Sequence, residues 1–114
     1  MSKDILTYNF FEELKSLSFV DEIWLFGSRA RGDNFDRSDI DIAILCDRAS
    51  DSDWIKITEI IDNADTLLKI DCIRFDKERL SPEFYENILK DKKVIYMKDL
   101  KWKDSFHSLG NAII

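Results

Sequence analysis

Two aspartates one residue apart, Asp39 and Asp41, lie at the start of an apolar run. In a β-strand the side chains alternate between faces, so both carboxylates would stand on one face, about 7 Å apart along the strand. Ile40, Ile42 and Ile44 would take the other face, as a core. Neighbouring carboxylates repel each other, and a divalent cation relieves that repulsion. Oxygen ligands without a His or Cys beside them favour a hard ion, Mg²⁺ or Mn²⁺.

A second chemical feature precedes the aspartates. Gly27-Ser28 follows an apolar run and leads into Arg29-Ala30-Arg31, which Gly32 closes. A strand-to-helix turn presents free N–H groups and the positive end of the helix dipole to an anion. Arg29 and Arg31 add side chains that can grip phosphate oxygens. A phosphate cradle beside a metal-binding carboxylate pair is what metal-assisted transfer from a nucleoside triphosphate needs.

The spacing of these residues carries a family resemblance. Gly27-Ser28, ten residues and then Asp39-x-Asp41 resemble the Gly-Ser-x10-Asp-x-Asp signature of the polymerase-β-like nucleotidyltransferase superfamily. The short chain and the local sequence GSRARGD…SDIDIAI resemble the minimal nucleotidyltransferase (MNT) family, known for antitoxins paired with HEPN-domain ribonuclease toxins. The glycines form neither a P-loop, because Asp33 follows Gly32 where a P-loop needs Lys, nor a Gly-x-Gly-x-x-Gly motif.

The resemblance also gives a role to Asp71, which lies in an apolar stretch predicted as a strand. A carboxylate there is costly unless it is paired or bound to metal. The superfamily resemblance implies a third acidic residue on a neighbouring strand, and Asp71 matches it by position. The alternative left open is an aspartate that faces water at a strand end, or that pairs with Arg74 or Lys69.

The resemblance implies transfer of AMP from ATP to a hydroxyl, with release of pyrophosphate. The acceptor that it implies is a tyrosine of a HEPN toxin, which would make this chain an antitoxin. Two alternatives stay open: an inactive binding module that neutralises the toxin sterically, and a small-molecule nucleotidyltransferase. The implied metal ligands for two Mg²⁺ ions are Asp39, Asp41 and Asp71, and the implied triphosphate ligands are Gly27, Ser28, Arg29 and Arg31.

Composition sets limits on these functions. A chain of 114 residues predicts one domain, and its net charge of −6 argues against a surface that binds nucleic acid broadly. No apolar run approaches the roughly 20 residues that span a bilayer, and no signal peptide is recognisable. Cys46 and Cys72 lie apart in apolar runs, which favours reduced thiols and a cytoplasmic location.

Periodicity predicts alternating helices and strands, and the resemblance implies that they form a small α/β (α+β) domain of nucleotidyltransferase type, with a mixed sheet flanked by helices. The expected domain covers 1–97, and 98–114 forms a tail in which Trp102, Phe106, Leu109 and Ile113 could make one helical face. The first helix should present Leu6, Phe10, Leu14 and Leu17 on one stripe, and the last should turn Phe84, Ile88 and Leu89 inward. The predicted strands are 22–26, 38–46, 67–75 and 94–97, the last of them at a sheet edge. The predicted helices are 2–18, 28–31 with Gly32 as its left-handed cap, one from 54 to about 64 that follows a capping-box pattern at Ser50-x-x-Asp53, and one that begins at Ser81-Pro82.

Overall fold

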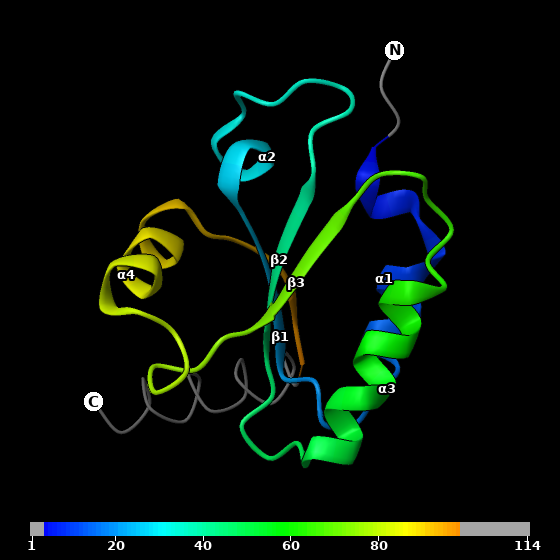
Figure 1. The fold of residues 1–114 in the computed structure, drawn as a ribbon. Helices are drawn as coiled ribbons and strands as arrows, with labels where there is room; N and C mark the ends of the chain where they lie inside the picture. The colour runs from blue at the N-terminus through cyan, green and yellow to red at the C-terminus, as the bar shows by residue number, and fades with distance from the viewer. Residues whose placement is uncertain (1–3, 99–114) are drawn as a thin grey trace, which may run out of the picture.

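The computed structural model describes residues 4–98 and consists of one four-stranded sheet with helices on both faces (Figure 1). The strands lie in the order β3-β2-β1-β4, which makes β3 and β4 the two edges. This arrangement confirms the predicted mixed sheet flanked by helices. The elements are the 3₁₀ turn η1 (Ile5–Thr7), α1 (Asn9–Lys15), β1 (Glu22–Phe26), α2 (Gly27–Arg31), β2 (Ile40–Leu45), α3 (Asp51–Asp62), β3 (Ile70–Arg74), α4 (Pro82–Asp91) and β4 (Lys93–Met97).

The strand directions bring three strand ends together. β1 runs antiparallel to β2, and β2 runs parallel to β3 through the crossover helix α3. The C-terminal end of β1 therefore lies beside the N-terminal ends of β2 and β3. β4 closes the sheet on the other side of β1, in antiparallel register. The predicted edge position of the last strand is confirmed.

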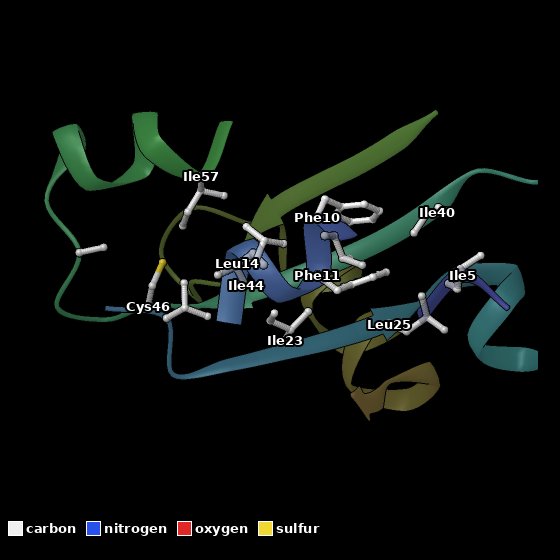
Figure 2. Close-up of a cluster of buried hydrophobic side chains, with 13 residues drawn as sticks. Ile5, Phe10, Phe11, Leu14, Ile23, Leu25, Ile40, Ile44, Cys46 and Ile57 are labelled. Atoms are coloured by element: carbon white, nitrogen blue, oxygen red, sulfur yellow. The ribbon is translucent and has the colours of Figure 1, made fainter. Parts of the chain in front are cut away.

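The two faces of the sheet have separate cores. α1 and α3 cover one face and α4 covers the other (Figure 1). The core beneath α1 and α3 contains the alternate residues of β2, and Ile40, Ile42 and Ile44 are all fully buried, as predicted. Figure 2 shows this cluster, with Phe10 and Leu14 of α1 against the strands. The smaller core beneath α4 contains Trp24, Phe26, Ala43, Phe75 and Ile88.

Three of the predicted helix caps are confirmed. The Ser50 hydroxyl accepts from the N–H of Asp53, whose carboxylate accepts from the N–H of Ser50, so the capping box exists with Asp in place of Glu. Ser81 caps α4, with Pro82 in the first turn. Gly32 ends α2 in the left-handed conformation, at φ +86°.

The prediction of one helix over residues 2–18 is wrong. The chain forms η1, becomes extended at Tyr8, and only then forms α1. The reason is a pair of separate caps: Asp4 caps η1, and the Asp65 carboxylate accepts from the N–H groups of Asn9 and Phe10 at 2.9 and 3.2 Å. Leu6, expected in the buried stripe, is 47% exposed because it precedes this break.

Other differences are smaller. β2 and β3 are shorter than predicted, and every residue of β3 is only half-buried because the strand forms an edge. Phe84, expected to face inward, is 38% exposed. Cys46 and Cys72 are free thiols, as expected, and only Cys46 is buried. None of the helices in 4–98 is long and apolar enough to cross a membrane. The predicted tail 98–114 lies outside the described residues, apart from Lys98.

Candidate active site

The carboxylates meet through the register of the sheet. Asp41 is the ladder partner of Phe26 on β1 and of Asp71 on β3. Partners in a sheet project on the same face, so Asp41 and Asp71 stand side by side on the α4 face. Asp39 immediately precedes β2 and acts on Asp41 electrostatically. The strand ends therefore bring together Asp41 and Asp71, which lie 30 positions apart in the sequence (71 − 41), and Asp39 is near enough for its charge to act on Asp41.

The charge state of Asp41 reflects this crowding. Its pKa is raised from 3.8 to about 6, first by burial, then by a side-chain hydrogen bond with Asp71 and by the charges of Asp71 and Asp39. The positive charge of Lys69 opposes the rise. A carboxylate that resists ionisation beside other carboxylates is one that a cation would stabilise.

Gly27 leaves room for Asp41. It has φ +71°, which non-glycine residues rarely adopt, and a Cβ at this position would lie 2.3 Å from Oδ2 of Asp41. The turn between β1 and α2 is therefore packed against the carboxylate, with no side chain between them. A ligand that binds Asp41 lies next to the backbone of this turn.

Asp71 is less buried than predicted. Its side chain is 43% exposed and its Oδ1 lies 3.5 Å from Nζ of Lys69, which is one of the alternatives considered for this residue. Arg74, the other suggested partner, instead donates to the carbonyls of Cys46 and Ala49. Burial therefore gives little support to a functional role of Asp71. The strand register, which pairs Asp71 with Asp41, does support such a role.

The two arginines of the turn contact protein groups in this structure. Arg29 donates to the main-chain carbonyls of Ser38 and Asp36. Arg31 donates to the carboxylates of Asp33 and Asp91, at 3.1 and 3.0 Å, and thereby joins α2 to α4. These two hydrogen bonds raise the pKa of Arg31 above its usual value. The contact of Arg29 and Arg31 with phosphate stays a prediction.

An open hollow of about 340 Å³ lies over the carboxylate pair. Its apolar wall includes Phe26 and Phe84, whose rings meet edge to face at 5.8 Å between centroids. Its polar wall is Asp41 and Asp71. The combination of apolar wall and carboxylates is typical of a ligand site.

The sequence pattern predicts Phe84 as a core residue and indicates Lys69 only as an alternative partner of Asp71. A phenylalanine at the third residue of α4 lies on the apolar stripe, and only the position of α4 over the hollow shows that its ring is part of the wall. No sequence pattern distinguishes that position from a core position.

The carboxylate oxygens of Asp41 and Asp71 are suitable ligands for a hard divalent cation. Asp41 and Asp71 supply carboxylate oxygens side by side, which is the ligand chemistry of Mg²⁺ and Mn²⁺. Within residues 4–98, no group of three or more His, Cys, Asp or Glu side chains is close enough together to hold a metal ion. Asp39 therefore belongs to the surroundings of the pair in this structure, and its role as a ligand stays a prediction.

A model of the family described as "Polymerase beta, Nucleotidyltransferase" matches residues 9–101 of this chain. The chain belongs to this family. The predicted superfamily is confirmed, and the matched residues contain every residue of the candidate site. No curated protein matches the chain significantly.

Solved structures of similar fold agree with this assignment. A candidate nucleotidyltransferase from Sulfolobus solfataricus is 25% identical, with a TM-score of 0.53 over 81% of this chain and 78% of that one. A toxin–antitoxin structure with AMP-PNP is 19% identical, with a TM-score of 0.54 over 92% and 93%. A mutant form of the MntA–HpeT toxin–antitoxin is also 19% identical, with a TM-score of 0.56 over 92% of both chains. This nucleotidyltransferase thus shares its fold with chains of toxin–antitoxin complexes.

Proposed function

We propose that this nucleotidyltransferase transfers AMP from ATP to a tyrosine hydroxyl of a HEPN ribonuclease toxin, and so acts as its antitoxin. The observation that carries the proposal is the side-by-side position of Asp41 and Asp71, directly against the backbone of Gly27. It places a carboxylate pair beside a turn suited to phosphate. The family assignment supports the reaction class.

The proposed site residues divide into two groups. Asp41 and Asp71, with Asp39 at the start of β2, would hold Mg²⁺, which neutralises phosphate charge and acidifies the attacking hydroxyl. Gly27 and Ser28 would offer backbone N–H groups to the triphosphate. Arg29 and Arg31 would add positive charge beside it. The apolar wall of Phe26 and Phe84 offers a surface for the base of the nucleotide.

The reaction requires little from the protein beyond position and charge. The acceptor oxygen bonds to the α-phosphorus of ATP, and the bond from that phosphorus to the oxygen bridging the α- and β-phosphates breaks. Pyrophosphate leaves with the electron pair of that bond. Asp71, whose side chain is 43% exposed and so reachable from solvent, would accept the hydroxyl proton.

A protein acceptor is the proposal that the structural neighbours favour. Two of them are chains of toxin–antitoxin structures, and one of these was solved with AMP-PNP. The hollow over the carboxylates is open, so an acceptor carried by another protein could approach.

A second candidate is a binding module that blocks its toxin without catalysis. The observation that favours it is the contact of Lys69 with Asp71, which places a cation of the protein where a metal would act. The two functions differ in one respect: only the enzyme needs the carboxylates of Asp39 and Asp41.

Thermal unfolding with each of the four nucleoside triphosphates, with and without Mg²⁺, provides the first test. Ligand at 100 times its dissociation constant should stabilise the wild type by about 2.7 kcal/mol, and Asp39→Asn/Asp41→Asn should lose this gain. Asp47→Asn/Asp62→Asn removes the same charge from two exposed positions outside the hollow and should retain the gain. If no triphosphate gives a Mg²⁺-dependent shift in Tm, the proposed enzymatic function is contradicted.

The acceptor is tested by mass spectrometry of the cognate toxin after incubation with ATP, Mg²⁺ and the antitoxin. We expect a gain of one or more AMP units on tyrosine, absent with Asp39→Asn/Asp41→Asn. An unmodified toxin that both antitoxin forms neutralise equally would establish the binding module instead.

A further inference from the structure

The loop between α2 and β2 has a defined internal structure. The N–H of Phe35 donates to the hydroxyl of Ser38 at 2.8 Å, and the N–H of Ser38 donates to the carbonyl of Phe35 at 3.1 Å. Residues 35–38 therefore form a closed turn directly before Asp39. The Phe35 ring, 82% exposed, contributes little packing, so hydrogen bonds must define this turn.

The guanidinium of Arg29 fastens this turn to α2. Its Nε and Nη2 donate to the carbonyl of Ser38, at 3.2 and 2.9 Å, and Nη2 also donates to the carbonyl of Asp36 at 3.0 Å. Three charged hydrogen bonds thus connect one helix side chain to two backbone carbonyls. The two bonds to Ser38 use the planar fork that distinguishes arginine from lysine.

The chain is also fixed on the other side of Asp39. The N–H of Ile40 donates to the carbonyl of Lys69 at 2.8 Å, which starts the pairing of β2 with β3. Asp39 therefore lies between two fixed backbone points, the Ser38 carbonyl held by Arg29 and the Ile40 amide held by β3. Its backbone position depends on both.

We propose that Arg29 is a positioning residue, which sets Asp39 for metal binding by clamping the carbonyls of Ser38 and Asp36. This inference rests on the proposed function, in which Asp39 is a metal ligand. It differs from a direct role at the phosphates, because moving the guanidinium onto a phosphate would release the turn that carries Asp39. Partners that orient a metal ligand typically affect metal affinity by about 10- to 100-fold.

The test measures Mn²⁺ binding by calorimetry, with no nucleotide present and then with a non-hydrolysable ATP analogue. Arg29→Lys retains the charge and loses the fork, and Arg29→Gln removes both. By charge alone, Arg29→Gln would strengthen Mn²⁺ binding, because it removes a repelling cation. Positioning predicts the opposite: both variants should bind Mn²⁺ about tenfold more weakly, with or without the analogue.

Two further variants make the test specific. Arg48→Gln removes an equal charge from an exposed side chain that pairs with Asp21, and it should leave Mn²⁺ binding unchanged. Ser38→Ala breaks the turn at its hydroxyl without altering Arg29, and it should also weaken Mn²⁺ binding. Hydrogen exchange at the Ser38 amide gives a readout without metal, and its protection should fall in both Arg29 variants.

The outcomes separate the two hypotheses. Wild-type affinity for Mn²⁺ alone in both Arg29 variants, with weaker binding only when the analogue is present, overturns positioning and establishes a phosphate ligand. If the Ser38 amide is as protected from hydrogen exchange in both Arg29 variants as in the wild type, the proposed positioning role of Arg29 is also overturned. A wild type that binds no Mn²⁺ under either condition overturns the metal site, and with it both proposals.

Discussion

The carboxylate of Asp41 occupies the space where a side chain on Gly27 would begin. A Cβ on Gly27 would lie 2.3 Å from Oδ2 and 3.1 Å from Cγ of Asp41. Both residues lie at strand ends, Gly27 after β1 and Asp41 in β2, where Phe26 and Asp41 are ladder partners. Glycine at this turn therefore serves the site as well as the backbone.

Gly27→Ala should disturb both folding and ligand binding. The positive φ makes any side chain strained, at a cost of about 1 kcal/mol, and the new Cβ must also displace Asp41. We expect a Tm lower by at least about 5 °C and loss of Mg²⁺-dependent stabilisation by ATP, both measurable by thermal unfolding.

Gly32→Ala is the matched control. Gly32 also has a positive φ, of +86°, but a Cβ there would meet nothing within 4 Å. It should lower the Tm through backbone strain alone and leave Mg²⁺ and ATP binding intact. Equal loss of binding in both variants would show that the contact with Asp41 is unimportant.

Asp41→Asn should stabilise the ligand-free protein above about pH 6. The folded-state pKa of Asp41, about 6, exceeds 3.8, so the native protein binds more protons between these values and loses stability as pH rises through them. Because the carboxylate is partly exposed, we expect Asp41→Asn to be more stable than the wild type by only about 1 kcal/mol, or about 5 °C in Tm. The Tm difference between variant and wild type should grow from pH 4 to pH 6 and then stay constant.

At pH 7, saturating Mg²⁺ with ATP should make the Tm of the wild type higher than that of Asp41→Asn, because only the wild type is stabilised by the cation. Binding by the wild type should weaken as pH falls through about 6, where Asp41 takes up its proton. A Tm difference that does not vary with pH would contradict the raised pKa.

Lys69→Gln should strengthen binding of Mg²⁺ at pH 8. Nζ of Lys69 lies 3.5 Å from the Asp71 carboxylate, so it competes with a cation for that oxygen. The pair is exposed and worth at most about 1 kcal/mol, which corresponds to an affinity gain of about fivefold or less. Titration calorimetry would measure it. Because Lys69 also lowers the pKa of Asp41, the variant should show its pH transition at a higher pH.

Lys56→Gln removes the same charge from α3, where Nζ lies 4.0 Å from Asp53, and should not alter Mg²⁺ binding. Weaker binding in Lys69→Gln would instead mean that the lysine supports the loaded site, for example at a phosphate.

Asp65→Ala should destabilise the fold without affecting the site. Its two carboxylate oxygens cap α1 at Asn9 and Phe10, and losing a cap costs about 1 kcal/mol or more. We expect a Tm lower by about 5 °C, with unchanged stabilisation by ATP and Mg²⁺. Asp62→Ala, at the exposed end of α3, is the control and should change the Tm little. Equal effects of the two would exclude the cap.

The sequence alone determined the core face of β2 and several helix ends, because these features depend on residues close together in the chain. The alternation of aspartate with Ile40, Ile42 and Ile44 defines which face of β2 is core, and all three isoleucines are fully buried. Ser50, Ser81 and Gly32 define helix ends because each satisfies or redirects backbone groups within a few residues. Such features depend only on neighbours along the chain.

The site itself was decided by tertiary structure. Asp71 reaches Asp41 because the crossover through α3 sets a parallel register, and the Gly27–Asp41 contact depends on the pairing of β1 with β2. The cap that Asp65 places on α1 joins residues 56 positions apart, so no local pattern predicted where that helix begins. Contacts between distant segments depend on how whole elements pack, and the side chains of a single segment carry no record of that packing.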